Sequence, residues 1–496
     1  MPENAENAAQ KAKVHEAQKP YVIGLDIGTT SLCATAVDTR DGSAARTIVR
    51  MNPAALPAAA PDERTQDPDR IVDELVEMIE AWRDLLPETA AIGISAQMHG
   101  ILYVDDRGRA VSPLYTWQDG RGERQVAEQE QEQDAPGATT YRQRLEALSG
   151  YPVPSGYGLL THDVLRRTGG VPAAAAKLCT VGDYAAMRLA GRAAPLIDAT
   201  QAASLGLFDV RSRSFDTAAA ARAGIDAALL PELAVPSGAR VGTTPGGIPV
   251  AAAIGDNQAS YLGAAPALAG CLLLNVGTGA QLSLYSPEPV RPASGLELRP
   301  FPGGGWLLAG ASLGGGKSYA LLAGLYREIA ETLGGGEGGV SDERLYAAMN
   351  RWALAALDEG RALPRVDAAF FGTRAEPDRT ATVAGLTPAT LTPQALTAGM
   401  LAGVADELAA FAAQLPPCLR VGVRRYVGAG NGIRRNPALR RLLEERLGAP
   451  LELAEAREEA AFGAAVHAAV CAGIFTDYDE ALDRIGGARL TEGDIV

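Results

Sequence analysis

Cysteine, histidine and aromatic residues are scarce in this sequence of 496 residues, and each scarcity excludes a class of protein. The 5 cysteines are widely scattered and form no CxxC pair, so neither a disulfide framework nor a structural zinc site is expected. The 4 histidines show no metal-ligand spacing. Aromatic residues make up only 5% of the chain, so alanine, leucine and valine must fill most of the core.

Positive charge and long apolar runs are also lacking. With 45 Lys and Arg residues against 59 Asp and Glu residues, the net charge is −14, which argues against a broad surface for nucleic acid or anionic membrane. No run reaches about 18 uninterrupted apolar residues, and the polar N-terminus has no apolar signal segment. We therefore expect a soluble, cytoplasmic protein without nucleic-acid or membrane partners. A homodimer is compatible with the sequence.

Strand and helix signals alternate along the chain, which indicates α/β layering. Apolar runs predict strands over 21–27 and 31–37, separated by a turn. Asp67 is a good N-cap, and Pro68 occupies the first position of the helix that follows. Further strands are predicted over 91–95 and 101–104, and the length of the chain predicts roughly two to four domains.

One segment of the chain occurs twice. Residues 273–279 (LLNVGTG) resemble residues 24–30 (GLDIGTT), about half the chain earlier. Each is an apolar strand followed by Asp or Asn, an apolar residue, Gly and Thr. Such GT dipeptides are common after strands, so chance is one explanation. The other is a pair of similar domains, each opening with the same hairpin, with both hairpins gripping one polyphosphate.

The first of these hairpins, over 26–31 (DIGTTS), suits an anion. Gly28 lets the backbone approach a phosphate, successive N–H groups form a nest for it, and Thr29 and Thr30 add hydroxyl donors. Asp26 stands at the strand end, where it is placed to hold a hydrated magnesium ion. An ordinary hairpin turn is the alternative interpretation.

Two further glycine-rich segments are candidates for nucleotide contacts. The turn over 428–432 (GAGNG) follows a predicted strand, and its glycines allow a flat base to approach. The alternative is a flexible turn between strand and helix, which this segment favours when taken singly. Residues 314–318 (GGGKS) fail the P-loop spacing, because Ala311 stands where that motif needs glycine. A glycine-rich helix start beside a nucleotide remains an option for Gly315, and Lys317 is expected to be a solvated cation.

Asp256 is the candidate general base. An apolar strand over 250–254 delivers this carboxylate beside backbone amides, and a kinase that phosphorylates an alcohol needs a group to accept the hydroxyl proton. A helix N-cap is the alternative role, and one residue can serve both. Residues 97–100 (QMHG) and 117–121 (WQDGR) combine polar groups with an aromatic face, as a sugar site requires. Taken singly, His99 and Trp117 are more often structural residues.

Nine segments in order resemble the FGGY family of carbohydrate kinases, which has the actin-like ATPase fold. The resemblance covers about residues 20 to 475. The segments are DIGTTS (26–31), GISAQMHG (93–100), TWQDGR (116–121), GDY (182–184), DATQAASLGLFD (198–209), GDNQA (255–259), NVGTGAQ (275–281), GAGNGIRRNP (428–437) and EEAAFGAA (458–465). Each motif is weak alone, but nine in order are specific.

The resemblance implies an α/β fold with two actin-like, ribonuclease-H-like domains flanking a deep cleft. The domains are expected over 20–263 (sugar side) and 264–480 (nucleotide side), between a disordered N-terminal tail over 1–19 and a C-terminal tail over 481–496. It also implies ATP and Mg²⁺ as cofactors and transfer of phosphate to the terminal primary hydroxyl of a ketose.

The resemblance further implies a role for each candidate residue. Asp256 is expected to act as the base and to contact the sugar, and Asp26 to hold the hydration shell of the metal. Phosphate contacts are implied for Gly28, Thr29, Thr30, Gly277 and Thr278, other nucleotide contacts for Gly315, Gly428, Gly430 and Asn436, and sugar contacts for Gln97, His99, Trp117 and Asp119. Cys33 stands where many members of the family carry lysine, so the resemblance assigns that side chain no role.

Within the family, the QMHG, WQDGR and GDNQAS segments are most similar to those of members that act on sedoheptulose. Asn257, next to Asp256, is shared with members that act on xylulose, so that substrate stays open. Two other classes are alternatives. A sugar sensor that no longer transfers phosphate would be free to lose Asp26 or Asp256, and an actin-like filament would leave the QMHG and WQDGR segments unexplained.

Overall fold

The computed structural model describes residues 19–126, 137–236, 238–293, 295–334, 340–373, 376 and 379–486, which form two compact units. Unit 1 contains the residues up to Ala267, the short segment Pro300–Gly304 and the residues from Glu458 onward. Unit 2 contains Leu268–Arg299 and Gly305–Arg457. The domain predicted over 264–480 is therefore divided, because its last part packs in unit 1.

The predicted tails fall mostly outside the described residues. Of the N-terminal tail over 1–19, only Lys19 is described. Of the C-terminal tail over 481–496, residues 481–485 belong to helix α17 (Tyr478–Ile485), which corrects that boundary. The Asp477 side chain caps this helix by accepting a hydrogen bond from the N–H of Glu480. Leu482 and Ile485 are buried within unit 1 and stabilise the helix by packing.

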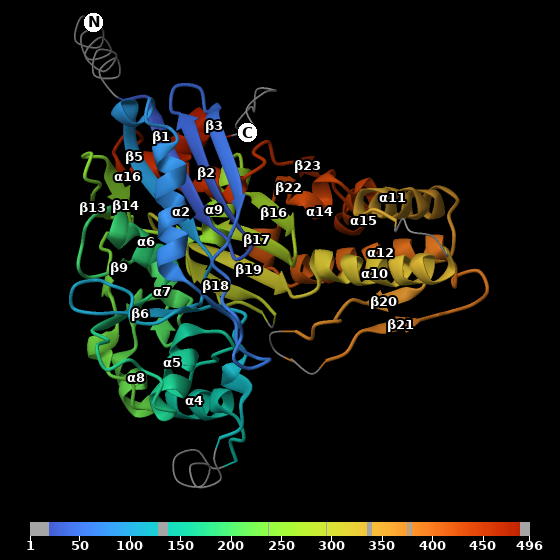
Figure 1. Ribbon diagram of the computed structural model, residues 1–496. Coiled ribbons are helices and arrows are strands. Elements are labelled where there is room, and N and C mark those ends of the chain that lie inside the picture. Colours follow the sequence, from blue (N-terminus) through green and yellow to red (C-terminus); the bar gives the residue numbers. More distant parts are fainter. Residues whose placement is uncertain are drawn as a thin grey trace, which may run out of the picture. The chain divides into compact units, whose positions relative to one another are not determined.

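A seven-stranded sheet forms the centre of unit 1 (Figure 1). Its main strands run in the order β13-β14-β5-β1-β2-β3, with β15 also paired to β5. The predicted strands over 21–27, 31–37 and 91–95 agree closely with β1, β2 and β5. The bounds are β1 (Tyr21–Ile27), β2 (Ser31–Asp38), β3 (Ala44–Met51), β5 (Thr89–Ala96), β13 (Arg240–Thr243), β14 (Pro249–Ala251) and β15 (Ile254–Gly255).

Helices cover both faces of this sheet. Ile23, Leu25 and Ile27 of β1 share a hydrophobic core with helices α2 and α6, while the alternate residues of β1 face α16. As predicted, Asp67 caps α2 and Pro68 begins it. The helices of unit 1 are α2 (Pro68–Glu80), α4 (Tyr141–Ser149), α5 (Gly158–Arg167), α6 (Val181–Leu189), α7 (Ala199–Ala203), α8 (Thr217–Ala223), α9 (Asp256–Ala264), α16 (Glu459–Cys471) and α17, with short 3-10 turns at η1 (Leu86–Glu88), η2 (Arg121–Glu123) and η3 (Ala227–Leu229).

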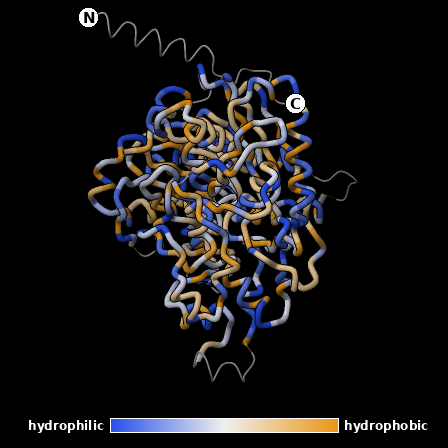
Figure 2. Tube along the Cα trace, turned by 90° about the vertical axis from the view of Figure 1, so that its left-hand side faces the viewer, coloured by the Kyte–Doolittle hydropathy of each residue, from blue (hydrophilic) through white to orange (hydrophobic). Residues whose placement is uncertain are grey.

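Four two-stranded sheets complete unit 1. They are β4 (Thr65–Gln66) with β7 (Leu114–Tyr115), β6 (Leu102–Val104) with β8 (Lys177–Cys179), β9 (Leu196–Ile197) with β12 (Glu232–Leu233), and β10 (Phe208–Asp209) with β11 (Ser214–Phe215). The apolar residues around β6, α4, α5 and α8 form a second core, separate from that of the large sheet. Figure 2 shows the hydrophobic segments mostly inside and the hydrophilic ones mostly at the periphery.

Unit 2 is built on a six-stranded sheet in the order β18-β19-β17-β16-β22-β23. Its strands are β16 (Cys271–Val276), β17 (Ala280–Ser286), β18 (Glu297–Pro300), β19 (Trp306–Ser312), β22 (Arg425–Ala429) and β23 (Glu452–Leu453), beside a hairpin of β20 (Arg365–Asp367) and β21 (Thr382–Ala384). Its helices are α10 (Gly315–Gly334), α11 (Asp342–Asp358), α12 (Pro393–Ala413), α13 (Pro417–Arg420), α14 (Asn431–Arg434) and α15 (Pro437–Leu447).

Helix α12 is the central helix of unit 2. Among the described residues it alone is long and apolar enough to cross a membrane by length and composition. Most of it is buried, however, and it packs against α11, α15 and the sheet. Its composition is therefore that of a core helix.

The internal repeat predicted from the sequence is present in the two large sheets. In unit 1, β1 is antiparallel to β2 and parallel to β5; in unit 2, β16 is antiparallel to β17 and parallel to β22. The next neighbours match as well, since β2 pairs with β3 and β17 with β19 in antiparallel ladders, while β5 pairs with β14 and β22 with β23 in parallel ones. The repeated hairpin thus opens the same five-stranded pattern in each unit.

Glycines allow helix α16 to lie directly on the strands of unit 1. A Cβ atom added at Gly24 of β1 would meet the carbonyl oxygen of Ala461, and one added at Gly93 of β5 would meet that of Ala464. On the other side of α16, Gly463 is equally close to the backbone of α9 at Ala259. The backbones of two strands and two helices are therefore in contact.

We expect Gly463→Ala to lower the free energy of unfolding by about 2 kcal/mol or more, because the added methyl must displace the backbone of α9. Helix propensity alone predicts the opposite sign, a gain of up to about 1 kcal/mol. Gly324→Ala on α10 is the matched control, since no atom lies within 4 Å of its added Cβ, and it should be stabilising. Urea unfolding of both variants tests this; a stabilised Gly463→Ala protein would contradict it.

Candidate active site

Two aspartates lie at one edge of the unit 1 sheet. In the parallel ladders, Asp26 of β1 is level with Ser95 of β5, which is level with Ile254 of β15. Asp256 follows β15 directly as the first residue of α9. Because the carboxyl ends of parallel strands meet at one edge, β1 and β15 deliver both carboxylates to the same place.

The surroundings of Asp26 hold its carboxyl in an unusual state. The side chain is half-buried, and its Oδ1 accepts a hydrogen bond of 2.7 Å from Ser95 Oγ. Burial raises the pKa of Asp26 to about 7, and the nearby carboxylates of Asp256, Glu458 and Glu459 contribute to the rise, against the lowering effect of Ser95. An acid in this state favours a cation beside it.

The alternative role of Asp256 as a helix N-cap is wrong, because Gly255 is the N-cap and Asp256 is the first residue of α9. Its Oδ1 accepts a hydrogen bond of 3.0 Å from Asn257 Nδ2. The third residue of α9, Gln258, is buried and donates to the carbonyl oxygen of Pro300. Asp256 and Asn257 are both partly exposed, so the first turn of α9 presents a carboxylate and an amide together.

The turn between β1 and β2 leaves backbone donors available. Gly28 N–H closes the turn by donating to Ser31 O at 3.0 Å. The next two amides, those of Thr29 and Thr30, have no acceptor among the residues described in this structure. Two successive N–H groups without partners are what an anion-binding nest requires.

Side chains from three other segments hold this turn in place. Thr29 Oγ1 donates to Gln97 Oε1 at 3.1 Å and accepts from Trp117 Nε1 at 2.9 Å. Gln66 closes the ring, because its Nε2 donates to Thr29 O at 2.8 Å and its Oε1 accepts from Gln97 Nε2 at 2.9 Å. The structure thus brings together Thr29, Gln97 and Trp117, which the sequence singled out, with Gln66, which it did not. Ser95, the partner of Asp26, was also not singled out.

His99 lies beside this ring in a strained conformation. Its φ is +77°, a value that non-glycine residues rarely adopt. The backbone N–H donates to Ser204 Oγ at 3.0 Å, and Nδ1 lies 2.9 Å from Ser204 O. Since a carbonyl only accepts, Nδ1 holds the proton. The imidazole stacks on Tyr157 with ring centroids 4.4 Å apart, which fixes its plane.

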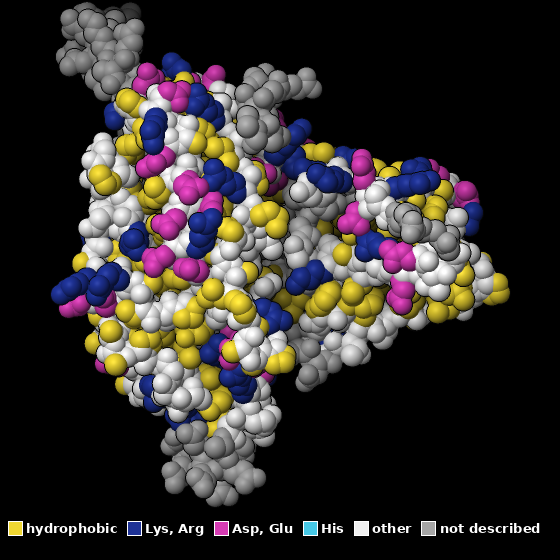
Figure 3. Space-filling model, in the orientation of Figure 1, with side chains coloured by type: hydrophobic (Ala, Val, Ile, Leu, Met, Phe, Trp, Pro, Cys, Tyr) yellow, Lys and Arg dark blue, Asp and Glu magenta, His cyan; other side chains and the backbone are white. Residues whose placement is uncertain are grey.

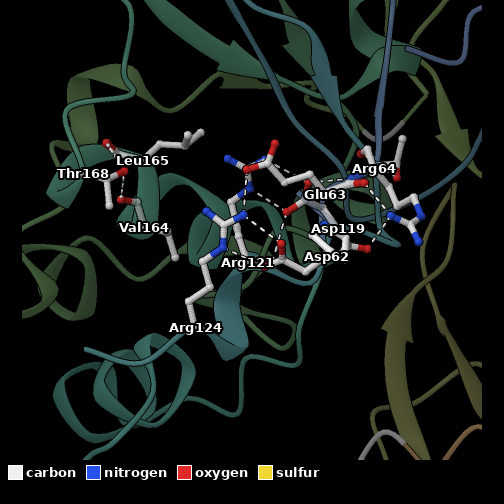
Figure 4. A network of polar contacts seen from close by, with 11 residues as sticks. Asp62, Glu63, Arg64, Asp119, Arg121, Arg124, Val164, Leu165 and Thr168 are labelled. Atoms are coloured by element: carbon white, nitrogen blue, oxygen red, sulfur yellow. Dashed lines mark hydrogen bonds and ion pairs between the residues drawn. The ribbon is translucent and has the colours of Figure 1, made fainter. Parts of the chain in front are cut away.

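Asp119 is engaged in a buried ion pair (Figure 4). Arg121 Nε donates to Oδ1 at 2.6 Å and Arg121 Nη2 to Oδ2 at 3.0 Å, and the backbone N–H of Arg64 also donates to Oδ2. Only 1% of Asp119 and 5% of Arg121 is exposed. The sequence had offered Arg121 within WQDGR, yet it assigned a role to Asp119 alone. The bidentate pair orders the segment that begins with Trp117.

The second glycine-rich hairpin, between β16 and β17, is held by a helix instead of side chains. Gly316 N–H donates to Gly277 O at 3.0 Å, and Lys317 N–H donates to Thr278 O at 2.9 Å. Gly315, with a φ of +30°, lies against the backbone of Gly279. The first turn of α10 thus caps the hairpin. The N–H groups of Thr278 and Gly279 have no acceptor within the part of unit 2 that is described.

The turn after β22 touches the same hairpin. Gly430 has a φ of +78°, and a Cβ there would lie 2.5 Å from Asn275 Oδ1. The structure therefore groups Gly277, Thr278, Gly315 and Gly430. It does not expose the other two predicted nucleotide residues, because Gly428 is packed under Leu451, and Asn436 is 5% exposed and caps α15 by accepting Leu439 N–H.

Comparison with known proteins identifies the family. The N-terminal domain of the FGGY family of carbohydrate kinases matches residues 21–263, and the C-terminal domain of that family matches residues 272–472. The chain belongs to the FGGY family. It is therefore an ATP-dependent sugar kinase, with ATP and a sugar as substrates.

Individual relatives agree with this assignment. The chain is 28% identical to sedoheptulokinase of Mus musculus over 91% of this chain and 97% of that protein. It is also 28% identical to xylulose kinase of Streptomyces coelicolor, over 56% of each chain. Among solved structures, xylulose kinase of Rhodospirillum rubrum has a TM-score of 0.76 at 22% identity, covering 96% of this chain and 95% of that one. The predicted α/β fold of two actin-like domains is confirmed.

We expect Arg121→Met to lower the free energy of unfolding by about 3 kcal/mol or more, because it leaves the Asp119 carboxylate buried without its partner. Adding Asp119→Asn should restore part of that loss. Arg124→Met is the control from the same network, since its pair with Asp62 is about one-third exposed and should contribute less than about 1 kcal/mol. Denaturant unfolding of the double-mutant cycle tests this, and strictly additive losses would contradict it.

Proposed function

We propose that this FGGY kinase phosphorylates the terminal primary hydroxyl of sedoheptulose, with D-xylulose as the second candidate substrate. The extent of the similarity supports this order. The match to the mouse sedoheptulokinase spans 97% of that protein, whereas the match to the Streptomyces coelicolor xylulose kinase spans 56% of its length. We place the reaction in the cytoplasm, where thiols such as those of Cys33 and Cys179 remain reduced.

In the proposed reaction, Asp256 accepts the proton of the attacking hydroxyl. Its position supports this role, because the strand end and the first turn of α9 fix a partly exposed carboxylate beside a second polar group, Asn257. A carboxylate held in this way stays close to the hydroxyl whose proton it accepts while the phosphate is transferred. Asp256 also contacts the sugar in this proposal, and Asn257 orients its carboxylate.

Mg²⁺ is the proposed metal, and Asp26 is its proposed ligand. The donor set fits, because Mg²⁺ prefers carboxylate oxygens and usually retains several waters when it binds beside phosphates. The described residues contain no group of three or more ligands that would enclose an ion completely. The raised pKa of Asp26 also fits, since burial and, after it, the nearby acids make an ionised carboxylate unfavourable there unless a cation lies beside it. Bound Mg²⁺ would neutralise charge on the phosphates.

The amides without acceptors in each hairpin are the proposed phosphate donors. In unit 1 these belong to Thr29 and Thr30, next to Gly28. In unit 2 they follow Gly277 and include Thr278, where Gly315 permits the close packing of α10. We assign the nucleoside to the surroundings of Gly430. Gly428 and Asn436 are buried, so in this proposal they support the turn and do not contact the nucleoside.

The proposed sugar site uses the polar ring of unit 1. Gln97 presents an amide whose position the ring fixes, and Trp117 presents the face of its ring, because its only N–H is donated to Thr29. His99 presents the imidazole edge away from its protonated Nδ1. Asp119 acts through Arg121 by ordering the WQDGR segment. Rigid placement matters here, because ketoses that differ by one hydroxyl are distinguished by polar groups held to about half an ångström.

We expect Mg·ATP turnover to be stimulated most strongly by sedoheptulose in a coupled assay of ADP release. The comparison panel is D-xylulose, D-ribulose, L-ribulose, L-rhamnulose, D-gluconate and glycerol, with the sugar-free rate as the baseline. A higher kcat/KM for D-xylulose would make D-xylulose the assigned substrate and would leave the proposed phosphate transfer unchanged. Sugar binding measured by calorimetry without any ADP release would instead favour a sensor.

We expect Asp256→Asn to lower kcat by at least about 100-fold, because the hydroxyl proton loses its acceptor. The dissociation constant for ADP, measured by calorimetry, should stay within a factor of about three. Asp41→Asn is the control, since Asp41 lies exposed in the turn between β2 and β3. Turnover within about threefold of the parent enzyme would remove Asp256 from the role of base.

A further inference from the structure

A short helix, α7, lies between the two cores of unit 1. Two of its alanines, Ala199 and Ala202, are buried in the core that surrounds β6, α4, α5 and α8. Its polar residues Thr200 and Gln201 are completely buried as well, but their side chains contact strands of the large sheet. Figure 1 draws α7 between that sheet and helices α4, α5 and α8. The helix therefore links the two parts of the unit.

Thr200 contacts the residue that precedes the proposed base. Its Oγ1 accepts a hydrogen bond of 3.1 Å from the backbone N–H of Gly255. Gly255 ends β15 and is the N-cap of α9, and Asp256 follows it directly. A buried N–H group is unfavourable without an acceptor, so the Thr200 hydroxyl fixes the position of this backbone. It thereby fixes the place where α9 begins.

Ser204, the C-cap of the same helix, contacts His99 of the proposed sugar site. Its Oγ accepts the backbone N–H of His99 at 3.0 Å and donates to the carbonyl oxygen of Gln201 at 2.7 Å. Helix α7 therefore orients this hydroxyl. The φ of His99 is +77°, and a non-glycine residue keeps such a conformation only where its surroundings hold it there. Ser204 supplies that constraint.

Gln201 bridges the two strands that lead to these residues. Its Nε2 donates to the carbonyl oxygen of Ala96 at the end of β5 and to that of Ile254 in β15, both at 3.1 Å. The chain continues from Ala96 to His99 and from Ile254 to Asp256. The ladder between β15 and β5 contains only two pairs of residues. The side chain of Gln201 therefore reinforces a short ladder at the point where the two segments diverge.

The amide oxygen of Gln201 is not used for stability. It is buried and has no hydrogen-bond partner among the residues that the structure describes. A buried polar atom without a partner destabilises a fold, and native proteins contain few of them. An apolar side chain would avoid this loss, but it would not join the two carbonyl groups. The bridge made by Nε2 is therefore what glutamine contributes at this position.

We propose that α7 positions the base and the sugar relative to each other. Thr200 positions the base, Asp256. Ser204 positions the sugar contact, His99, and Gln201 sets the separation between the two. None of these three residues of α7 and its C-cap contacts the substrate, so they are positioning residues. The proposal rests on the proposed function, from which it takes the roles of Asp256 and His99.

The contacts that α7 makes with the two strands and with His99 join uncharged groups. Many charged side chains lie on the surface instead, where Figure 3 shows Lys and Arg interspersed with Asp and Glu. Salt screens exposed charges of that kind, but it does not weaken buried hydrogen bonds between uncharged groups. Positioning by α7 is therefore independent of ionic strength.

Steady-state kinetics of three variants of the full-length kinase test the proposal, because each variant should change a different constant. Thr200→Val should lower kcat at least about tenfold and leave KM for the ketose within about threefold. Ser204→Ala should raise that KM at least about tenfold and leave kcat within about threefold. Gln201→Met should change both constants. Both ketoses, sedoheptulose and D-xylulose, are measured. The same constant changing in Thr200→Val and Ser204→Ala would overturn the proposal.

Thr89→Val is the matched control. Thr89 is also completely buried, and its hydroxyl donates to the carbonyl oxygen of Leu85 at 2.9 Å, but it lies at the opposite end of β5 from Ala96. Thr89→Val and Thr200→Val should lower the thermal midpoint by similar amounts, whereas only Thr200→Val should lower kcat. Thr200→Ser keeps the hydroxyl and should restore most of kcat. An equal loss of kcat in both valine variants would show general destabilisation and overturn the proposal.

A double-mutant cycle separates this proposal from the assignment of the base. Because Thr200 acts through Asp256, Thr200→Val should lower kcat by no more than about twofold in the Asp256→Asn background. A further tenfold loss there would overturn the proposal. If Asp256→Asn loses turnover while Thr200→Val keeps it, only the role of α7 fails. If Asp256→Asn keeps full turnover, the base and the role of Thr200 fail together.

Discussion

The candidate site depends on how closely helix α16 lies on the unit 1 sheet. At Gly24 and Gly463, backbone atoms of the neighbouring elements occupy the space that a side chain would need. Side chains alternate between the two faces of a strand, so Asp26, two residues after Gly24, faces the start of α16. Burial raises the pKa of Asp26, and the acids at 458–459 add to the rise from that position. Because α16 also contacts α9, the same packing fixes the helix that begins with Asp256, and both carboxylates share one rigid support.

The residue that pairs with Asp26 in the β1–β2 ladder carries no positive charge. Cys33 stands opposite Asp26 in the β1–β2 ladder, at the position where many FGGY kinases carry lysine. Burial raises the pKa of the Cys33 thiol, so it is neutral and offers no positive charge. Under the proposed function, the compensating cation arrives from outside as Mg²⁺ with ATP. Binding of the cation then favours the ionised form of Asp26, which links metal affinity to pH.

Local features of the fold could be predicted because they depend on a few neighbouring residues. The alternation of apolar residues and the glycine turn were sufficient for β1 and β2, and Asp67 with Pro68 for the start of α2. The segment from Glu458 onward could not be placed, because its apolar pattern says that it is buried but not against which sheet. The same limit applies to Asp119. As a polar residue beside an aromatic one, Asp119 suggested a sugar ligand. Its hydrogen bonds to Arg121 and to the N–H of Arg64 depend on the folded arrangement of the chain, which the sequence does not specify.

The repeated hairpins differ at one position in a way that separates their proposed tasks. Asp26 in unit 1 corresponds to Asn275 in unit 2, and both end a central strand beside a parallel neighbour. Asn275 keeps the shape of the aspartate without its charge, and its Oδ1 lies against the turn at Gly430. A carboxylate there would add negative charge beside the proposed nucleotide phosphates. The uncharged amide avoids that repulsion, while the retained charge of Asp26 suits a metal. Under the proposed function, this one difference between the repeated hairpins favours the cation beside the hairpin of unit 1, while both hairpins offer backbone amides to the phosphates.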